Sequence, residues 1–450
     1  MRKGSLWVTT ALGFAAIALL VLAIGVRRYD GLHGLVLRVR AELPASHAEI
    51  MAPTALPTSV VASRNTPTAS VTATASVTAT ATRAATATPA WTATPHSTGT
   101  PAPTASATPV PTDTPVPTAT PLPTQAPLLA DAQPVLPRVA LTGMRHEWQT
   151  WNNCGPASLS FMLSYYGSPL RQADVAAAVH PNMDDKHTGI PQLERYAQEQ
   201  GWRTWSRVNG DADLIKQFLS NGMPVMMPTW HVDPKGTGMG HYRVVAGYDD
   251  ASQEWLLWDS LEHRGVGDGE YTGVRLSYAQ FEEWWQVQNR AFLVAFPAER
   301  APVVEAILGD RIDDATMWAA SLAHARQMVD ERPEDPFAWF TLGTNLVNTG
   351  QPQEAAAAYD RAREIGLPVR MMWYQHGAFQ AYYESGRFEE VVALADATIA
   401  VTDMVEELHY WRGRALAALG DIDGARAALE KAASQRAGYT EAIEALAALG

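Results

Sequence analysis

The first apolar feature of the chain is an uncharged run, residues 6–26, "LWVTTALGFAAIALLVLAIGV". It has about 20 residues, enough to cross a bilayer as one helix. The run is longer than the apolar core of a typical cleaved signal, although small residues near its end fit a cleavage site. We therefore assign residues 1–30 to an N-terminal transmembrane anchor, with a cleaved signal as the alternative. Basic residues flank both ends, so the run leaves its own orientation open.

Apolar periodicity is absent from the next stretch, which is rich in threonine, proline and alanine, as in "TPVPTDTPVPTATPLPTQAP". Such a composition buries too little apolar surface to offset the entropy lost on ordering. We predict that residues 31–137 form a juxtamembrane segment and a disordered, partly extended linker. Thr/Pro-rich stalks are common in exported proteins and often carry O-linked sugar; an unmodified spacer is the alternative. We therefore expect a single-pass protein of the cell membrane whose C-terminal domains are extracytoplasmic.

Helical and strand patterns are mixed in residues 138–300, which predicts an α+β domain. Apolar residues recur on one helical face after Cys154, and Gly167 supplies a stop for that helix. Further along, Tyr242–Gly247 and Glu254–Asp259 read as two strands joined by the turn-rich "YDDAS". The domain therefore contains at least one amphipathic helix and one β-hairpin.

Residues 311–450 are almost entirely helical in pattern, alanine-rich and repetitive. Gly343 and Tyr359 recur as Gly413 and Leu429, shifted by 70 positions. An intermediate copy begins about 34 positions after the first, and a period of this length with small residues at these steps resembles tetratricopeptide repeats. We predict a short all-α solenoid of three repeats with a helix on either side; a non-repeating helical bundle is the alternative.

Composition narrows the possible functions. The formal net charge of −13 and the lack of a basic stripe argue against nucleic-acid binding. One cysteine in 450 residues forms neither an internal disulfide nor a zinc site of several thiolates. His146-Glu147 lacks the second histidine of a zinc-peptidase helix, and "GTGMG" precedes a strand rather than the helix of a dinucleotide site. We therefore expect no metal and no cofactor.

The single cysteine lies in "WNNCGPASLSFMLSYYG", at the point where the helix is expected to begin. With Asn153 or Cys154 near the N-cap and Pro156 in the first turn, the thiol lies at a helix N-terminus, where the helix dipole favours a thiolate. The alternative is a small buried residue in the core, and this stretch alone does not separate the two. A nucleophilic thiol needs a base and a group that orients the base, so the partners decide.

Among twelve histidines, His241 has the context of such a base. If Tyr248–Ser252 is a five-residue loop, Gly247 pairs with Gln253, and His241 lies directly opposite Asp259 on the same face of the hairpin. In that geometry a carboxylate orients an imidazole. Taken singly, each residue is better explained as a solvated strand-end histidine or a turn-capping carboxylate. The combination with Cys154 favours the catalytic interpretation.

Other residues near the thiol are candidates for the same site. Gln149, five positions before Cys154, is the candidate second donor to an oxyanion beside the Cys154 backbone N–H; a surface glutamine is the alternative. Trp148 and Trp151 flank this stretch and are the candidate substrate contacts, although core packing is the usual role of tryptophan. His231 is a weaker candidate base, since no carboxylate follows it at hairpin spacing.

In order and context, "NNCGPAS", "GHYRVVAGYDD" and "LLWDS" resemble the papain-like cysteine peptidases of the bacteriocin-processing, double-glycine-leader type. The similarity is strongest for the free-standing bacterial branch without a transporter, and it covers about residues 138–297. It implies a helical half and a sheet half with the active site between them. Since this chain has no transporter or ATP-binding part, the double-glycine specificity of the best-known members is not carried over.

The resemblance also implies a role for each site residue. Cys154 attacks a peptide carbonyl, His241 acts first as base and then as acid, Asp259 orients His241, and Gln149 stabilises the oxyanion. We therefore expect a membrane-tethered, extracytoplasmic cysteine peptidase whose repeats bind a protein substrate or partner. A catalytically silent surface binding module is the first alternative, which the four intact residues disfavour. A cell-wall amidase or acyl transferase on the same fold is the second, made less favourable by the "CGP" context.

Overall fold

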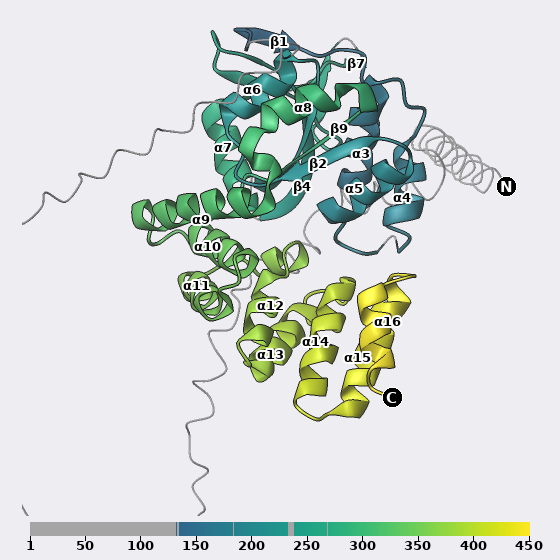
Figure 1. The fold of residues 1–450 in the computed structure, drawn as a ribbon. Helices are drawn as coiled ribbons and strands as arrows, with labels where there is room; N and C mark the ends of the chain where they lie inside the picture. The colour runs from purple at the N-terminus through teal and green to yellow at the C-terminus, as the bar shows by residue number, and fades with distance from the viewer. Residues whose placement is uncertain (1–131, 133–134, 183, 233–237, 268) are drawn as a thin grey trace, which may run out of the picture. The chain divides into compact units, whose positions relative to one another are not determined.

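The computed structural model describes residues 132, 135–182, 184–232, 238–267 and 269–450 (Figure 1). The predicted transmembrane anchor and nearly all of the predicted linker lie outside these residues. Within the described part of the chain, no helix is both long enough and apolar enough to cross a membrane.

The first domain is built on an antiparallel sheet. Its described strands, with the separate β6–β7 ribbon, are β1 (Arg138–Ala140), β2 (Arg203–Arg207), β3 (Val225–Val232), β4 (Gly238–Asp249), β5 (Glu254–Trp258), β6 (Val266–Gly267), β7 (Glu270–Tyr271), β8 (Val274–Ser277) and β9 (Phe292–Phe296). The order in the sheet is β2-β9-β3-β4-β5-β8, and β1 also pairs with β4. Eight consecutive residues of β4 are buried, which marks it as a strand covered on both faces.

Helices cover this sheet. They are α3 (Cys154–Tyr165), α4 (Gln172–Val179), α5 (Ile190–Glu199), α6 (Ala212–Ser220), α7 (Tyr278–Trp285) and α8 (Ala301–Leu308). Helix α3 packs against β3 and β4, α5 against β2 and β9, and α7 against β3, β5 and β8. The apolar residues of α8 belong to the same core as the sheet, so this core extends to Leu308. The mixed architecture agrees with the predicted α+β class.

Helix α3 is more deeply buried than its sequence pattern predicts. Instead of one apolar face, ten consecutive residues from Gly155 to Ser164 are buried. Buried serines are tolerated because each hydroxyl donates to a carbonyl: Ser158 bonds Tyr242 O (3.1 Å) and Ser160 bonds Ala157 O (2.8 Å). The apolar residues Leu159, Met162 and Leu163 are buried as their pattern indicates, and the hydrogen-bonded serines let the rest of the helix enter the core as well.

The C-terminal part is all helical. It comprises α9 (Asp314–Glu331), α10 (Pro336–Asn348), α11 (Pro352–Ile365), the 3-10 turn η6 (Val369–Trp373), α12 (Gly377–Glu384), α13 (Phe388–Ile399), α14 (Glu406–Ala418), α15 (Ile422–Gln435) and α16 (Thr440–Ala447). Successive helices pack on one another along the chain. Three helical hairpins with a helix on either side were predicted, and they are present. The middle hairpin departs from the others, because its first helix is preceded by η6 and has only eight residues.

The repeat glycines are required by close helix packing. A Cβ atom on Gly343 would lie 2.8 Å from the Tyr359 ring, and one on Gly413 would lie 2.7 Å from Leu429 Cγ. These are the pairs that the sequence relates by the shift of 70 positions. The first and third hairpins therefore pack their second helix directly on the backbone of the first.

We predict that Gly343→Ala destabilises the folded protein by about 1–3 kcal/mol, because the added methyl group overpacks a contact with a buried aromatic ring. Urea unfolding measures the change. Asn348→Ala is the matched control on the exposed face of the same helix and should alter stability by no more than about 0.5 kcal/mol. Equal stability of the Gly343→Ala variant and the wild-type protein would show that the two helices are not packed as described.

Candidate active site

Cys154 is the first residue of α3 and follows the N-cap residue Asn153. The Asn153 side chain does not cap the helix; it donates to Thr150 Oγ1 (2.6 Å) and bonds His180 Nδ1 through its Oδ1 atom (2.8 Å). These two bonds fix the residue immediately before the thiol. Cys154 itself is half-buried, at the end of the helix where the dipole favours a thiolate.

His241 is hydrogen-bonded to both Cys154 and Asp259. Its Nε2 atom lies 2.9 Å from Asp259 Oδ1, and the ring also forms a hydrogen bond with the Cys154 side chain. Since Nε2 faces the carboxylate, Nδ1 is the nitrogen left to face the thiol. The His241 and Asp259 side chains are buried, at 2% and 1% exposed. The structure thus brings together three of the residues that the sequence singled out.

The electrostatics of the three residues favour a thiolate–imidazolium pair. Burial raises the pKa of Cys154, but the hydrogen bond and charge of His241, with backbone hydrogen bonds to Tyr242 and Gly155, outweigh burial and lower this pKa. Burial lowers the pKa of His241, yet the charge of Asp259 overcomes it and raises the pKa to about 8. Both shifts favour transfer of the Cys154 thiol proton to the His241 imidazole.

The contact between His241 and Asp259 does not arise from the predicted register. Asp249 pairs with Glu254, so the connection has four residues rather than five, and a bulge lies between Val245 and Gly247. Extending the observed pairing past Trp258 puts Arg243, not His241, opposite Asp259. The register prediction was wrong. His241 lies two residues before Arg243 on the same face of β4, and its side chain reaches the Asp259 carboxylate diagonally.

Arg243 is a site residue that the sequence analysis missed. Its Nε atom lies 2.7 Å from Asp259 Oδ2, and both side chains are buried. The backbone N–H groups of Leu261 (2.8 Å) and Glu262 (3.0 Å) donate to Asp259 Oδ1. Burial alone would raise the pKa of Asp259, but the charges of His241 and Arg243 hold it far below its usual range. An arginine two residues after His241 in an otherwise apolar strand was the available signal.

Gln149 is held beside the same loop. Its backbone N–H donates to Ser260 O (3.0 Å), and its side-chain Oε1 accepts from Ser260 Oγ (2.8 Å). Since Oε1 is engaged, the Nε2 end of the amide is the part that can donate. Ser260 directly follows Asp259, so one loop positions the carboxylate and the glutamine together. Among the described residues, no group of three or more histidine, cysteine or carboxylate side chains is placed to hold a metal ion.

Two protein-family models match parts of this chain. Residues 141–291 match the model of the Peptidase_C39 like family, and residues 406–438 match the tetratricopeptide repeat model. The chain carries a C39-like papain-type domain followed by tetratricopeptide repeats. The repeat model matches the last of the three helical hairpins, formed by α14 and α15. A search of curated proteins gave no match.

Solved structures similar to part of this chain include a C39-like peptidase from Bacillus anthracis, with 15% identity over 35% of this chain and 96% of that one (TM-score 0.28). The peptidase domain of Streptococcus ComA, a bifunctional ABC transporter, is 21% identical over 35% of this chain and 99% of its own (TM-score 0.27). Xylellain, a cysteine protease from Xylella fastidiosa, is 12% identical over 38% of this chain and 89% of its own (TM-score 0.29).

The two tryptophans proposed as substrate contacts lie in different surroundings within the C39-like domain. The Trp148 ring stacks on His263, with centroids 4.1 Å apart, and meets His146 edge-on. The Trp151 ring lies 5.1 Å from Lys186 Nζ, and its indole nitrogen is buried without a hydrogen-bond partner. Packing accounts for most of the Trp148 surroundings, whereas Trp151 has an unused donor. Substrate contact by either residue stays a prediction.

His231 lies closer to the C39-like site than the sequence suggested. Its Nδ1 atom is 2.9 Å from Arg243 Nη2, and its ring centroid is 6.0 Å from that of His241. Burial, together with the charge of Arg243, lowers the pKa of His231 to about 4, so the ring is neutral at pH 7. A neutral ring that faces Arg243 acts as an acceptor that orients the arginine. This arrangement supports the preference for His241 as the base.

Two glycines of "GTGMG", Gly238 and Gly240, have a packing role. A Cβ atom on Gly238 would fall within 2.4 Å of the Trp230 indole, and one on Gly240 would lie 3.0 Å from the Tyr374 ring. Tyr374 follows η6, so the repeat part of the chain reaches the strand residue directly before His241. Tyr374 also bonds the Gly240 backbone. No sequence signal links these two positions, which lie 134 residues apart in the chain.

Proposed function

We propose that the chain is a cysteine peptidase that hydrolyses peptide bonds through Cys154, His241, Asp259 and Gln149. The observation that carries this proposal is the hydrogen bonding of one buried imidazole to both the thiol and the carboxylate. The lowered pKa of Cys154 and the raised pKa of His241 support it, because they favour the charged pair that attacks without a separate deprotonation step.

In this mechanism the Cys154 thiolate attacks the scissile carbonyl carbon, and the carbonyl electron pair moves to the oxygen. The Gln149 Nε2 amide and the Cys154 backbone N–H donate to that oxyanion. The His241 imidazolium then protonates the leaving amine as the C–N bond breaks and a thioester remains. His241, now neutral, takes a proton from water, which attacks the thioester and releases the carboxylic acid and the thiol. Asp259 keeps the His241 ring oriented throughout.

We also propose that residues 1–30 tether this peptidase to the cell membrane with its folded domains outside the cytoplasm. The uncharged run of residues 6–26 and the Thr/Pro-rich linker support this proposal. The repeats would hold a protein substrate or partner near the active site. Sedimentation of the full-length protein with membranes, and its release when residues 1–30 are deleted, tests the tether.

The proposal predicts a bell-shaped dependence of kcat/KM on pH. Activity should rise as Cys154 ionises and fall above about pH 8, where His241 loses the proton that the leaving amine requires. Since the Asp259 charge raises the pKa of His241, Asp259→Asn should move the alkaline limb to lower pH. An alkaline limb that does not move in this variant would contradict the assigned role of Asp259.

The deciding experiment is the alkylation rate of Cys154 against pH in the full-length protein, with and without His241→Ala. The chain has one cysteine, so every alkylation event reports on this residue. A thiol paired with histidine at a helix N-terminus should react well below pH 8.5, and this advantage should be lost in the variant. Titration near 8.5 in both proteins would refute the nucleophile and leave the silent binding module. Profiling with peptides and cell-wall amides separates a peptidase from an amidase.

A further inference from the structure

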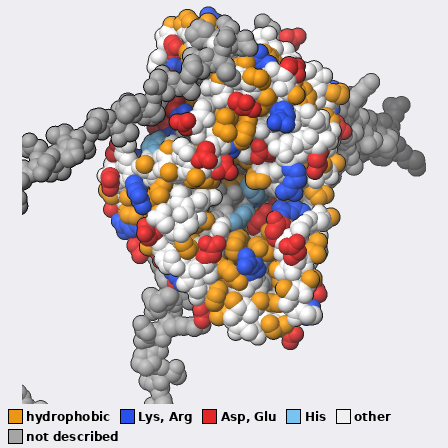
Figure 2. Space-filling view, in the orientation of Figure 1, with side chains coloured by type: hydrophobic (Ala, Val, Ile, Leu, Met, Phe, Trp, Pro, Cys, Tyr) orange, Lys and Arg blue, Asp and Glu red, His pale blue; other side chains and the backbone are white. Residues whose placement is uncertain are grey.

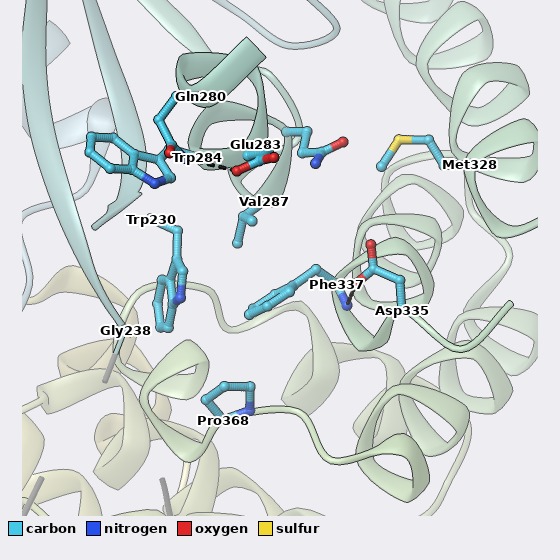
Figure 3. A pocket seen from close by; sticks show the side chains of 11 residues that line it. Trp230, Gly238, Gln280, Glu283, Trp284, Val287, Met328, Asp335, Phe337 and Pro368 are labelled. Carbon is cyan, nitrogen blue, oxygen red and sulfur yellow. Dashed lines mark hydrogen bonds between the residues drawn. The ribbon is translucent and has the colours of Figure 1, made fainter. Parts of the chain in front are cut away.

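A cavity of about 530 Å³ lies where the C39-like domain meets the repeats (Figure 3). Trp230 of β3 and Trp284 of α7 line one side, and Phe337 of α10 and Pro368 line the other. Figure 3 shows the side chains surrounding a common space, with helical-repeat residues facing residues of the C39-like domain. The cavity is within the size range of small-ligand sites, and neither domain forms it alone.

The lining has the chemistry that binds a cation. Three aromatic rings meet two carboxylates, those of Glu283 and Asp335, and the described lining contains no lysine, arginine or histidine. Aromatic faces attract cations through their quadrupole, and a carboxylate adds direct charge complementarity. The apolar residues Val287 and Met328 can pack against a hydrocarbon stem. This combination fits the long side chain of lysine or arginine better than a small hydrated ion.

The charges around the cavity leave Glu283 as the principal counter-ion. Asp335 Oδ2 already pairs with Arg332 (3.1 Å), and its Oδ1 atom caps Phe337 N (2.9 Å). Glu283 is exposed, and its Oε2 atom accepts one hydrogen bond, from Gln280 (2.8 Å). Arg243 lies 4.7 Å from the Trp284 ring and pairs with Asp259. Arg290 bonds the lining residue Met328 and pairs with Glu282, and Arg370 donates to the Gly238 carbonyl. Glu283 is therefore the lining carboxylate that a cation can meet without displacing a salt bridge described for it.

The cavity lies within reach of a peptide held at Cys154. The Trp284 ring of its wall lies 5.8 Å from the His231 ring, and the His231 ring lies 6.0 Å from the His241 ring, both measured between centroids. An extended peptide advances about 3.3 Å per residue, so a long side chain within about four residues of the scissile bond can span the interval. Figure 2 shows histidine side chains in a hollow of the molecular surface, with acidic side chains nearby.

Direct contacts hold the two walls of the cavity in place. Arg370 Nη1 donates to Gly238 O (3.1 Å), and Gln375 Nε2 donates to Gln288 Oε1 (2.8 Å). Further along α10, Asn345 and Asn289 are buried and bonded to one another (3.2 Å). The Trp230 ring also packs against Phe337, with centroids 5.7 Å apart. These contacts fix both halves before any ligand arrives.

We propose that this cavity is a substrate subsite that selects a basic side chain, lysine or arginine, near the scissile bond. The proposal rests on the peptidase function proposed above and names its substrate class. It also assigns a role to the repeats, which supply Phe337 and Asp335 and so complete the specificity of the C39-like domain. The selected side chain inserts its ammonium or guanidinium group between the aromatic rings and the Glu283 carboxylate.

The test uses acetylated peptides that contain either one lysine or norleucine, which keeps the straight carbon chain of lysine without the charge. The position of this residue is varied across a library of internally quenched peptides. The full-length protein is assayed with each peptide, and the kcat/KM values are compared. We expect a preference for lysine of about tenfold at one position. Glu283→Gln and Phe337→Leu should each reduce the preference about threefold or more. Glu305→Gln removes an equal charge from an exposed site on α8 and should leave the preference unchanged.

A second measurement does not depend on catalysis. Binding of labelled lysine and norleucine peptides to the Cys154→Ala variant, followed by fluorescence anisotropy, should show the same preference and the same response to Glu283→Gln. Hydrolysis without a preference for lysine, or equal binding of the two peptides, overturns the subsite and leaves the peptidase function standing. Preferential binding without hydrolysis by the wild-type protein supports the subsite and refutes the peptidase function.

Discussion

The His241→Ala variant is expected to lose peptide hydrolysis by roughly a thousandfold or more, measured as kcat/KM on any peptide that the wild-type protein cleaves. Two effects combine in this loss. Without the imidazole, the pKa of Cys154 rises, because the hydrogen bond and charge that offset its burial are removed. The leaving amine also loses its proton donor.

His231→Ala is the matched control, because it removes a neighbouring histidine from the same hairpin. The His231 ring is neutral and faces Arg243, so the variant loses about one hydrogen bond. We therefore expect kcat/KM to fall by no more than about tenfold. Circular dichroism should show that both variants are folded. If His231→Ala is the more damaging of the two, the base has been assigned to the wrong histidine.

Asp259→Ala is expected to destabilise the folded protein by about 3–5 kcal/mol, besides abolishing activity. The carboxylate is buried and pairs with Arg243 as well as His241, so its removal leaves a buried guanidinium without its counter-charge. Since folding lowers the pKa of Asp259, its stabilising effect is present at neutral pH and is lost as the solution is acidified. Urea unfolding at pH 7 measures the change.

The double variant Asp259→Leu/Arg243→Met separates the contribution of the ion pair to stability from the contribution of side-chain packing at the same place. Replacing both charged groups by apolar side chains of similar volume should recover most of the stability lost in Asp259→Ala, while activity stays absent. A double variant as unstable as Asp259→Ala would show that the loss comes from packing or backbone hydrogen bonds rather than from the unpaired arginine.

Much of the fold could be predicted because its signals are local. The repeat period, the glycine and aromatic positions at Gly343 and Tyr359, and the helix that follows Cys154 are all read from spacing within a few turns of helix. The hairpin of β4 and β5 was located correctly, and its register was not. A one-residue bulge and a shorter turn are small in sequence, yet they move every cross-strand partner.

The candidate site shows the same division. Cys154, His241, Asp259 and Gln149 were chosen from the sequence because each residue type has a chemical role in a thiol peptidase. Arg243 holds Asp259 in place and Ser260 holds Gln149, and both were missed. In a sequence without its fold, nothing distinguishes this arginine or this serine from the many that have no part in a site. Their function is visible only as distances between groups far apart in the chain.

By itself, the sequence determined the order of the domains, the repeat length and the residue types available for catalysis, because hydrophobic periodicity and residue chemistry are properties of short segments. The tertiary structure decided the orientation of His241 between its two partners, the burial of the Asp259–Arg243 pair and the approach of Tyr374 to Gly240. It also decided that two domains share the walls of one cavity. These features depend on packing between distant segments, where changes of about an ångström determine which groups meet.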